Sequence, residues 1–243
     1  MGVRVDQIAL VTGADRGLGL GLCLSLLKRG WHVIAGQFMA DWPGLSALGL
    51  QYPDRLTTVT LDVANDTSVG RAAQTVGATT GHLDLLINNA GITAPSNYLT
   101  IRESPNYDDM QRIININALG SLRVVQAFLP LMDASVTKRL CFISSEAGSV
   151  GASKRKGWFG YCMSKAALNM AVKNLHNELY PEGYSFRLYY PGWLRSYMGG
   201  VKSDRGDLEP EEAAEMAMPI LLSSRADESR LVMVDFKGQE WPW

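Results

Sequence analysis

Short apolar runs alternate along the chain with longer segments in which apolar residues recur every three or four positions. The short runs are rich in Val, Ile, Leu and aromatic residues, and their continuous hydrophobicity is typical of parallel strands buried on both faces. They predict strands at residues 8–13, 32–37, 55–63, 83–89, 139–145, 186–192 and 230–236. The longer segments predict helices at residues 17–29, 65–79, 107–133, 158–180 and 210–222.

This alternation predicts an α/β fold with a doubly wound, seven-stranded, mostly parallel sheet that carries helices on both faces. The 243-residue length suits one large domain. No repeat, low-complexity tract or Pro/Gly-rich linker divides the sequence. We therefore expect a single domain over residues 1–243.

Composition and charge argue against several classes of protein. The formal net charge is -1 and the pI is about 6.3, without the long basic stripe of a nucleic-acid-binding protein. The three cysteines form no CxxC pair and no His/Cys cluster at metal-ligand spacing. No leader peptide and no continuous apolar run of about 18 residues is evident. We expect a cytoplasmic protein that binds no metal, nucleic acid or membrane.

Four glycines lie around the junction of the first predicted strand and the first predicted helix, in ALVTGADRGLGLGL at residues 9–22. A strand-to-helix turn in a doubly wound sheet presents free backbone N–H groups to an anionic pyrophosphate. Gly13 would allow the tight turn, Gly17 the close approach of a phosphate, and Gly19 the close packing of the helix on the sheet. A flexible corner without a ligand is the alternative. The flanking strand and helix favour a dinucleotide site of the Rossmann type.

The spacing Thr12-Gly13-x-x-x-Gly17-x-Gly19 resembles the TGxxxGxG pattern of the short-chain dehydrogenase/reductase family. Further motifs of that family follow at Asp62-Val63, Asn88-Asn89-Ala90-Gly91, Tyr161 to Lys165 (YxxxK) and Pro191-Gly192. The stretches SEAGSVG, YCMSKAALNM and PGWLRSYMGG, with the ending DFKGQEWPW, resemble the C-factor and sniffer-type carbonyl reductase branch. The resemblance implies an oxidoreductase that transfers a hydride between a nicotinamide dinucleotide and a carbonyl or alcohol.

The resemblance also implies which residues bind the cofactor. They are Gly13, Arg16, Gly17, Leu18, Gly19, Gln37, Asp62, Val63, Asn89, Ala90, Gly91, Tyr161, Lys165, Pro191, Gly192 and Ser196. NAD-specific enzymes carry an acid after the second strand, which contacts the ribose 2′-hydroxyl and would repel a 2′-phosphate. Gln37 and Phe38 supply no carboxylate there, whereas Arg16 can pair with a 2′-phosphate. We expect NADP(H) rather than NAD(H), the alternative being that Arg16 faces only solvent.

Tyr161 and Lys165 lie four residues apart, on one face of a predicted helix and within side-chain reach. An ammonium about 5 Å from the phenol, together with an oxidised nicotinamide, would bring the pKa of Tyr161 toward neutrality. Tyr161 could then act as general acid and general base. An ordinary surface pair at helical spacing is the alternative.

A serine and an asparagine complete the catalytic set that the resemblance implies. Ser145 would hydrogen-bond the substrate oxygen, with Ser144 as the other possibility. Asn117 would hold a proton-relay water, with Asn115 as the weaker alternative. Ser145 and Tyr161 are 16 positions apart, about three more than is usual in the family, which predicts a longer loop at the mouth of the substrate site.

Other functions remain open. A catalytically silent nucleotide sensor or an NAD-dependent alcohol dehydrogenase would use the same fold. A sugar-nucleotide epimerase or dehydratase usually carries a substantial C-terminal substrate domain, and only 51 residues follow Gly192. The three histidines provide no evident Ser/His/Asp site. We expect a small carbonyl or alcohol substrate and a homodimer or homotetramer.

Two surface features fit more than one role. The basic run at residues 154–156 is either a solvated loop or a contact for an anionic substrate. The ending at residues 241–243, Trp-Pro-Trp, is more typical of packing or a subunit contact than of a substrate wall.

Overall fold

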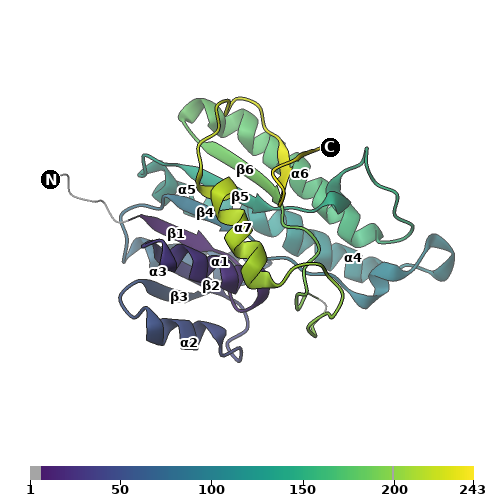
Figure 1. Ribbon diagram of the computed structural model, residues 1–243, viewed down its shortest axis with the longest axis horizontal. Coiled ribbons are helices and arrows are strands. Elements are labelled where there is room, and N and C mark those ends of the chain that lie inside the picture. Colours follow the sequence, from purple (N-terminus) through teal and green to yellow (C-terminus); the bar gives the residue numbers. More distant parts are fainter. Residues whose placement is uncertain (1–6, 199) are drawn as a thin grey trace.

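The computed structural model describes residues 7–198 and 200–243. Its centre is an eight-stranded sheet with the order β3-β2-β1-β4-β5-β6-β7-β8 (Figure 1). The strands are β1 (Ile8–Val11), β2 (His32–Gln37), β3 (Leu56–Thr60), β4 (Leu85–Asn88), β5 (Arg139–Ile143), β6 (Ser185–Tyr190), β7 (Met233–Asp235) and β8 (Glu240–Trp241). Neighbouring strands are parallel except for β7 and β8. The predicted α/β fold with a mostly parallel sheet is confirmed.

The helices cover both faces of the sheet, as predicted. They are α1 (Gly17–Lys28), α2 (Gly44–Gln51), α3 (Asp66–Gly77), α4 (Tyr107–Ile114), α5 (Gly120–Asp133), α6 (Phe159–Leu179) and α7 (Pro210–Leu222). One apolar core lies between the sheet and α3, α5 and α6. A second lies between the opposite face and α1, α2 and α7. The carboxyl ends of the parallel strands therefore share one edge between the two helix layers.

Two elements go beyond the predicted set. The eighth strand contains only two residues, Glu240–Trp241, and pairs antiparallel with β7, so it carries too short an apolar pattern to predict. Helix α2 follows Pro43 without a side-chain cap and has no acidic residue in its first turn or basic residue in its last. Its residues therefore lack the usual signals of a helix boundary.

The predicted helix at residues 107–133 is one continuous helical run with a change of winding in its middle. Between α4 and α5, residues Asn115–Leu119 form a π turn. By length and composition the run could cross a membrane, but it packs on the sheet through core residues that include Val124, Val125 and Phe128. The fold accounts for its apolar composition without a membrane. The π turn contains Asn117, one of the residues expected at the active site.

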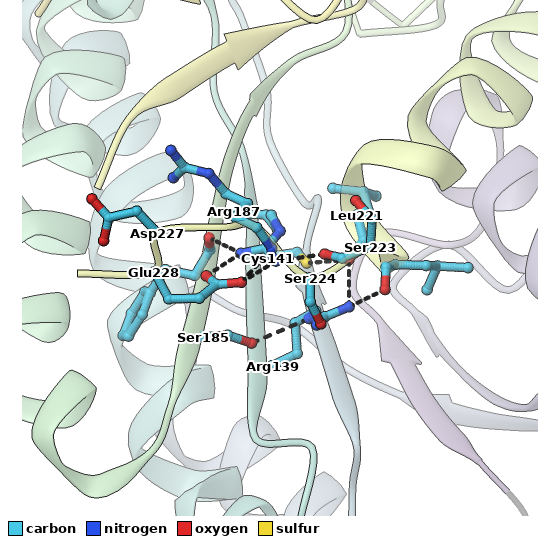
Figure 2. A network of polar contacts seen from close by, with 12 residues as sticks. Arg139, Cys141, Ser185, Arg187, Leu221, Ser223, Ser224, Asp227 and Glu228 are labelled. Atoms are coloured by element: carbon cyan, nitrogen blue, oxygen red, sulfur yellow. Dashed lines mark hydrogen bonds and ion pairs between the residues drawn. The ribbon is translucent and has the colours of Figure 1, made fainter. Parts of the chain in front are cut away.

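A polar network fixes the edge of the sheet opposite the strand carboxyl ends (Figure 2). Arg187 of β6 makes two hydrogen bonds of 2.7 Å to the Glu228 carboxylate. Arg139, the first residue of β5, donates to the carbonyl oxygens of Leu221 and Leu222 at the end of α7. Cationic side chains stabilise a helix C-terminus, where carbonyl groups lack helical partners. The network anchors α7 and the segment after it to β5 and β6.

Candidate active site

The glycine loop between β1 and α1 has the backbone conformation that the motif requires. Gly13 and Gly17 have φ values of +62° and +56°, in the left-handed region that favours glycine. A Cβ at Gly13 would lie 2.9 Å from the Ala90 Cα. A Cβ at Gly19 would lie 2.1 Å from the Gly13 carbonyl oxygen. A Cβ at position 19 would also lie 2.6 Å from the Asn89 side-chain nitrogen, directly after β4, so glycine there lets the helix approach both the loop and the end of β4.

The carboxyl ends of β1 and β4 are joined beneath this loop. The Thr12 hydroxyl accepts hydrogen bonds from the backbone N–H groups of Asn89 (3.0 Å) and Ala90 (2.9 Å). The Asn89 side chain donates to the carbonyl oxygens of Thr12 (2.9 Å) and Gly13 (3.1 Å). Asn89 and Ala90 thus lie beside the glycine loop, where the resemblance placed cofactor contacts, but the Asn89 side chain acts as a support for that loop.

The loop has the shape and charge to receive a phosphate. Among the described residues, nothing lies within 4 Å of a Cβ added at Gly17, so the backbone there is open to a ligand. Helix α1 begins at Gly17 and has no acidic residue in its first turn. Free N–H groups at a helix N-terminus attract anions. Gly13, Gly17, Leu18 and Gly19 therefore fit the pyrophosphate of a dinucleotide.

Arg16, in the glycine loop, reaches the segment after β2 with its side chain and is held there by contacts that the motifs did not indicate. Its guanidinium lies 4.6 Å from the centroid of the Trp42 ring. One of its nitrogens contacts the Met39 sulfur at 2.7 Å and another donates to the Tyr197 carbonyl oxygen at 3.3 Å. The Tyr197 ring packs edge-on against Trp42, with 4.9 Å between the centroids. These contacts are incompatible with an arginine that faces only solvent.

Asp15, the acid of the glycine loop, is engaged by the backbone that follows β2. Its side chain is buried and accepts hydrogen bonds from the backbone N–H groups of Phe38 (2.9 Å) and Met39 (2.8 Å). Gln37 ends β2 just before them. The acid in the glycine loop is thus used to fix the chain after β2, and the position where NAD-specific enzymes carry an acid remains uncharged.

Residues expected near the adenine and the nicotinamide lie at the same edge of the sheet. Asp62 follows β3, and its carboxylate accepts a hydrogen bond of 2.9 Å from the Ala64 N–H. Val63 packs against Gly120, where a Cβ would lie 2.9 Å from a Val63 methyl carbon. Pro191 and Gly192 follow β6, and Gly192 has a φ of +86°. Ser196 lies four residues further on, in the loop that contributes Tyr197.

Asn117 is buried within the π turn and connects two segments. Its side-chain oxygen accepts a hydrogen bond from the Ile92 N–H (2.8 Å). Its amide nitrogen donates to the Ile92 carbonyl oxygen and to the Ser164 hydroxyl, both at 3.0 Å. Both amide N–H groups are therefore used. Asn117 thus positions the chain after Gly91 against α6, and its role toward a relay water stays a prediction.

Tyr161 and Lys165 lie on the first two turns of α6, with the Lys165 Nζ 5.8 Å from the centre of the Tyr161 ring. The ammonium is buried and donates a hydrogen bond of 2.9 Å to the Ile143 carbonyl oxygen at the end of β5. Burial lowers the pKa of Lys165 to about 8. These contacts exclude an ordinary surface pair, because a surface lysine would keep its ammonium in water.

The two serines after β5 have different surroundings. The Ser144 hydroxyl is buried and donates a hydrogen bond of 2.6 Å to the side-chain oxygen of Asn169 on α6. The Ser145 hydroxyl donates to Glu146 at 2.6 Å and accepts from the Ala147 N–H at 3.1 Å. Ser145 also lowers the pKa of Tyr161. Of the two, Ser145 is therefore the hydroxyl that acts on the tyrosine.

In the protein alone, burial is the main cause that keeps Tyr161 protonated. Burial raises its pKa and the Glu146 carboxylate raises it further, whereas Ser145 and Arg155 lower it, and the net change is upward. A protonated phenol is the form that a general acid needs. The sequence predicts that Lys165 and an oxidised nicotinamide together lower the pKa of Tyr161. That decrease would therefore require the positive charge of the nicotinamide.

Several contributors to this site escaped the motif analysis. Asp15, Glu146 and Tyr197 lie within quoted stretches, but the resemblance gave none of them a role. Trp42 lies in no quoted motif, and Arg155 was indicated only as part of the basic run. The basic run and the serine-to-tyrosine spacing indicated an unusual loop, but not which side chain pairs with Glu146. Across residues 7–198 and 200–243, no group of three or more His, Cys, Asp or Glu is placed to hold a metal ion.

Comparison with known proteins agrees with this geometry. Residues 7–206 match the family model described as short chain dehydrogenase. The chain therefore belongs to the short-chain dehydrogenase/reductase family and is an oxidoreductase. It is 37% identical over 164 residues to the C-signal protein of Myxococcus xanthus. The aligned residues cover 68% of this chain and 95% of that protein.

Solved structures extend the comparison over almost the whole chain. A short-chain dehydrogenase/reductase from Burkholderia multivorans with bound NADP has a TM-score of 0.84 and 30% identity, covering 98% of this chain and 100% of that one. The NADPH-bound carbonyl reductase from chicken fatty liver has a TM-score of 0.85 and 29% identity, and the match covers 99% of this chain and 100% of that one. The single Rossmann-like domain is thus shared with enzymes that bind this cofactor.

Proposed function

We propose that the protein is an NADP(H)-dependent carbonyl reductase, which reduces a ketone or aldehyde to an alcohol in a reversible reaction. The observation that carries this proposal is the convergence of Ser145, Tyr161 and Lys165 at the carboxyl end of β5, the same edge of the parallel sheet at which the glycine loop follows β1. When bound, the cofactor would supply or accept the hydride. The NADP-bound relatives and the carbonyl reductase from chicken fatty liver support the choice of cofactor and reaction.

The side chains divide the proton chemistry between them. The Tyr161 hydroxyl gives its proton to the carbonyl oxygen during reduction and takes a proton from the alcohol during oxidation. To stabilise the same oxygen as negative charge develops on it, the Ser145 hydroxyl turns toward the substrate the proton that it donates to Glu146 in the structure. Lys165 uses one N–H on the Ile143 carbonyl oxygen, which holds its ammonium close to Tyr161. Asn117 keeps the chain after Gly91 in register with α6.

The preference for NADP(H) over NAD(H) rests on the surroundings of Arg16. Stacking on Trp42 and the hydrogen bond to the Tyr197 carbonyl restrict the guanidinium before any ligand arrives. Less conformational freedom is then lost when a phosphate binds. An arginine pairs with a phosphate through two parallel hydrogen bonds, whereas a ribose hydroxyl offers no negative charge. The NAD-dependent alcohol dehydrogenase is the alternative within this reaction class.

Turnover of a panel of ketones and aldehydes with NADPH, followed by loss of its absorbance, tests the proposal. We expect wild-type activity on part of the panel. Tyr161→Phe should lower kcat/KM by about 10²-fold or more and keep cofactor binding, because the general acid is lost. Tyr107→Phe, at an exposed tyrosine of α4, is the matched control and should retain activity. Near-normal turnover by Tyr161→Phe would refute the mechanism.

A catalytically silent sensor is the rival from another class. It predicts NADPH binding with no turnover across the whole panel, whereas the reductase predicts both. The identity of the substrate, the cytoplasmic location and the homodimer or homotetramer remain predictions. Light scattering coupled to size-exclusion chromatography tests the assembly.

A further inference from the structure

The loop that separates Ser145 from Tyr161 places one member of its basic run against an acid. Lys154, Arg155 and Lys156 are all exposed to solvent. The Arg155 guanidinium also forms an ion pair and hydrogen bond with the Glu146 carboxylate, next in sequence to Ser145. Only about a third of the Arg155 side chain and a quarter of the Glu146 side chain remain exposed, at 36% and 24%. Neither the proposed reaction nor the cofactor site accounts for this pair.

The Glu146 carboxylate contacts the catalytic serine directly. One of its oxygens accepts the Ser145 hydroxyl proton at 2.6 Å, and the other contacts Arg155. An unpaired carboxylate here would place a full negative charge beside the oxygen of the substrate, where the reduction itself builds up negative charge. It would therefore oppose the reaction unless a cation compensates it.

The position of Arg155 is fixed by aromatic packing. Its guanidinium lies 4.7 Å from the centroid of the Trp158 ring. That ring packs edge-on against Tyr161, at 6.0 Å, and against Tyr98, at 4.7 Å. Trp158 itself has a φ of +59°, and its N–H donates a hydrogen bond of 2.7 Å to the Asn97 carbonyl oxygen. The loop conformation therefore holds the arginine at the mouth of the site.

The pair acts on several ionisable groups at once. Tyr161 faces Ser145, Glu146 and Arg155, has Cys162 beside it on α6, and has Lys165 one turn further on. Glu146 raises the pKa of Tyr161 and Arg155 lowers it. Likewise, Glu146 raises the pKa of the Cys162 thiol and Arg155 lowers it. Tyr190, at the end of β6, responds to the same two charges. Arg155 thus offsets the effect of Glu146 at each of these groups.

We propose that Arg155 is a positioning residue that holds Glu146 in a neutral ion pair beside Ser145 and Tyr161, so that the reacting oxygen meets no net negative charge from the loop. This inference rests on the proposed reductase function, because it assigns the pair to the same catalytic site. Arg155 of the basic run then acts within the protein, as the partner of Glu146.

Cys162 provides a test that needs no substrate. It is partly exposed, whereas Cys23 and Cys141 are fully buried, so alkylation by the uncharged reagent iodoacetamide reports its thiolate. An uncompensated charge within about 10 Å, partly screened by water, shifts a pKa by about half a unit to one unit. At a pH below the thiol pKa, Arg155→Gln should therefore slow alkylation about three- to tenfold.

The remaining variants make the test specific for the pair. Glu146→Gln should speed alkylation by a similar factor, and the double variant should return close to the wild-type rate. Lys156→Gln removes the same charge from the same loop and should leave the rate unchanged. Loss of labelling in Cys162→Ser assigns the reaction to this thiol. Equal effects of Arg155→Gln and Lys156→Gln, or effects of the same sign for Arg155→Gln and Glu146→Gln, would overturn the proposal.

The catalytic consequence is measured as the pH profile of alcohol oxidation, with a neutral alcohol that corresponds to a reduced member of the panel. Because oxidation needs the Tyr161 phenolate, the acid limb of kcat should move to higher pH in Arg155→Gln and to lower pH in Glu146→Gln. A lowered kcat with an unmoved limb in both variants would overturn the proposal. Failure of the proposed function shows separately, as turnover that survives Tyr161→Phe.

Discussion

Replacing Lys165 by methionine should remove a buried charge that destabilises the folded protein. The ammonium lies in a residue that is 3% exposed, and it donates one hydrogen bond, to the Ile143 carbonyl oxygen. Burial lowers the pKa of Lys165 from 10.5 to about 8. Each pKa unit corresponds to about 1.36 kcal/mol, so carrying this charge at pH 7 costs the folded state about 3 kcal/mol.

The sign of the pH dependence follows from that lowered pKa. Below pH 8 the lysine is protonated in both the folded and the unfolded state. Between about pH 8 and 10.5 the folded protein loses this proton while the unfolded chain retains it, so the group makes the free energy of unfolding rise with pH. From pH 7 to pH 9.5 the rise is about 2 kcal/mol. Lys165→Met should lack this rise.

Urea unfolding of wild type and Lys165→Met at pH 7 and pH 9.5 measures the difference. The lost hydrogen bond to Ile143 costs about 1 kcal/mol at either pH, so it changes the offset between the two proteins and leaves the slope intact. Lys173→Met, at an exposed lysine of the same helix, is the control and should keep the wild-type dependence. Parallel profiles for wild type and Lys165→Met would refute the reasoning.

Three further substitutions test other parts of the site. Ser145→Ala should lower kcat/KM by about 10²-fold, as expected for a lost donor to the developing oxyanion. Ser144→Ala should mainly lower the free energy of unfolding, by about 1–3 kcal/mol. Equal effects of the two variants on kcat/KM would contradict the assignment of Ser145. Gly17→Ala should raise KM for NADPH and NADH alike, because the φ of +56° is strained for alanine and the added methyl group would face the phosphate. The control Gly70→Ala, within α3, should leave KM unchanged and leave the stability of the protein equal or higher. Arg16→Ala should raise KM for NADPH about tenfold or more and leave KM for NADH nearly unchanged, and equal loss of both cofactors would remove its role in discrimination.

The parts of the fold that could be predicted are those in which local pattern and tertiary environment agree. The strands predicted at residues 8–13 and 83–89 carry continuous apolar runs, at 8–11 and 85–87, because they lie in the middle of a sheet covered on both faces. Helix α2 was missed because its ends lack capping and charge signals. Strand β8 depends on pairing with β7 and has almost no pattern of its own.

The candidate site likewise contains residues that the sequence could place and residues that it could not. The glycines and the tyrosine–lysine pair could be placed because their spacing directly encodes a turn and a helix face. The position of Arg155 against Glu146 depends on Trp158 at positive φ and on its contact with the Asn97 carbonyl, 61 positions away in the chain. The clamp on Arg16 likewise needs Trp42 and Tyr197, which meet only after the fold is complete. Such contacts have no local pattern that a single sequence displays.

The network at the opposite edge of the sheet makes one part of the molecule vulnerable to acid. Arg139 and Arg187 lie in adjacent strands, and Glu228 is the carboxylate that pairs with Arg187 (Figure 2). Burial raises the pKa of Glu228, but hydrogen bonds from Arg187 and from the Arg225 N–H outweigh it and hold the pKa below the ordinary 4.5. The stability from this carboxylate is complete above pH 4.5 and is lost as the pH falls through the lowered pKa. Two neighbouring guanidinium groups then repel each other within the sheet, so acid unfolding would begin as a local separation of β6 from β5, far from the dinucleotide loop.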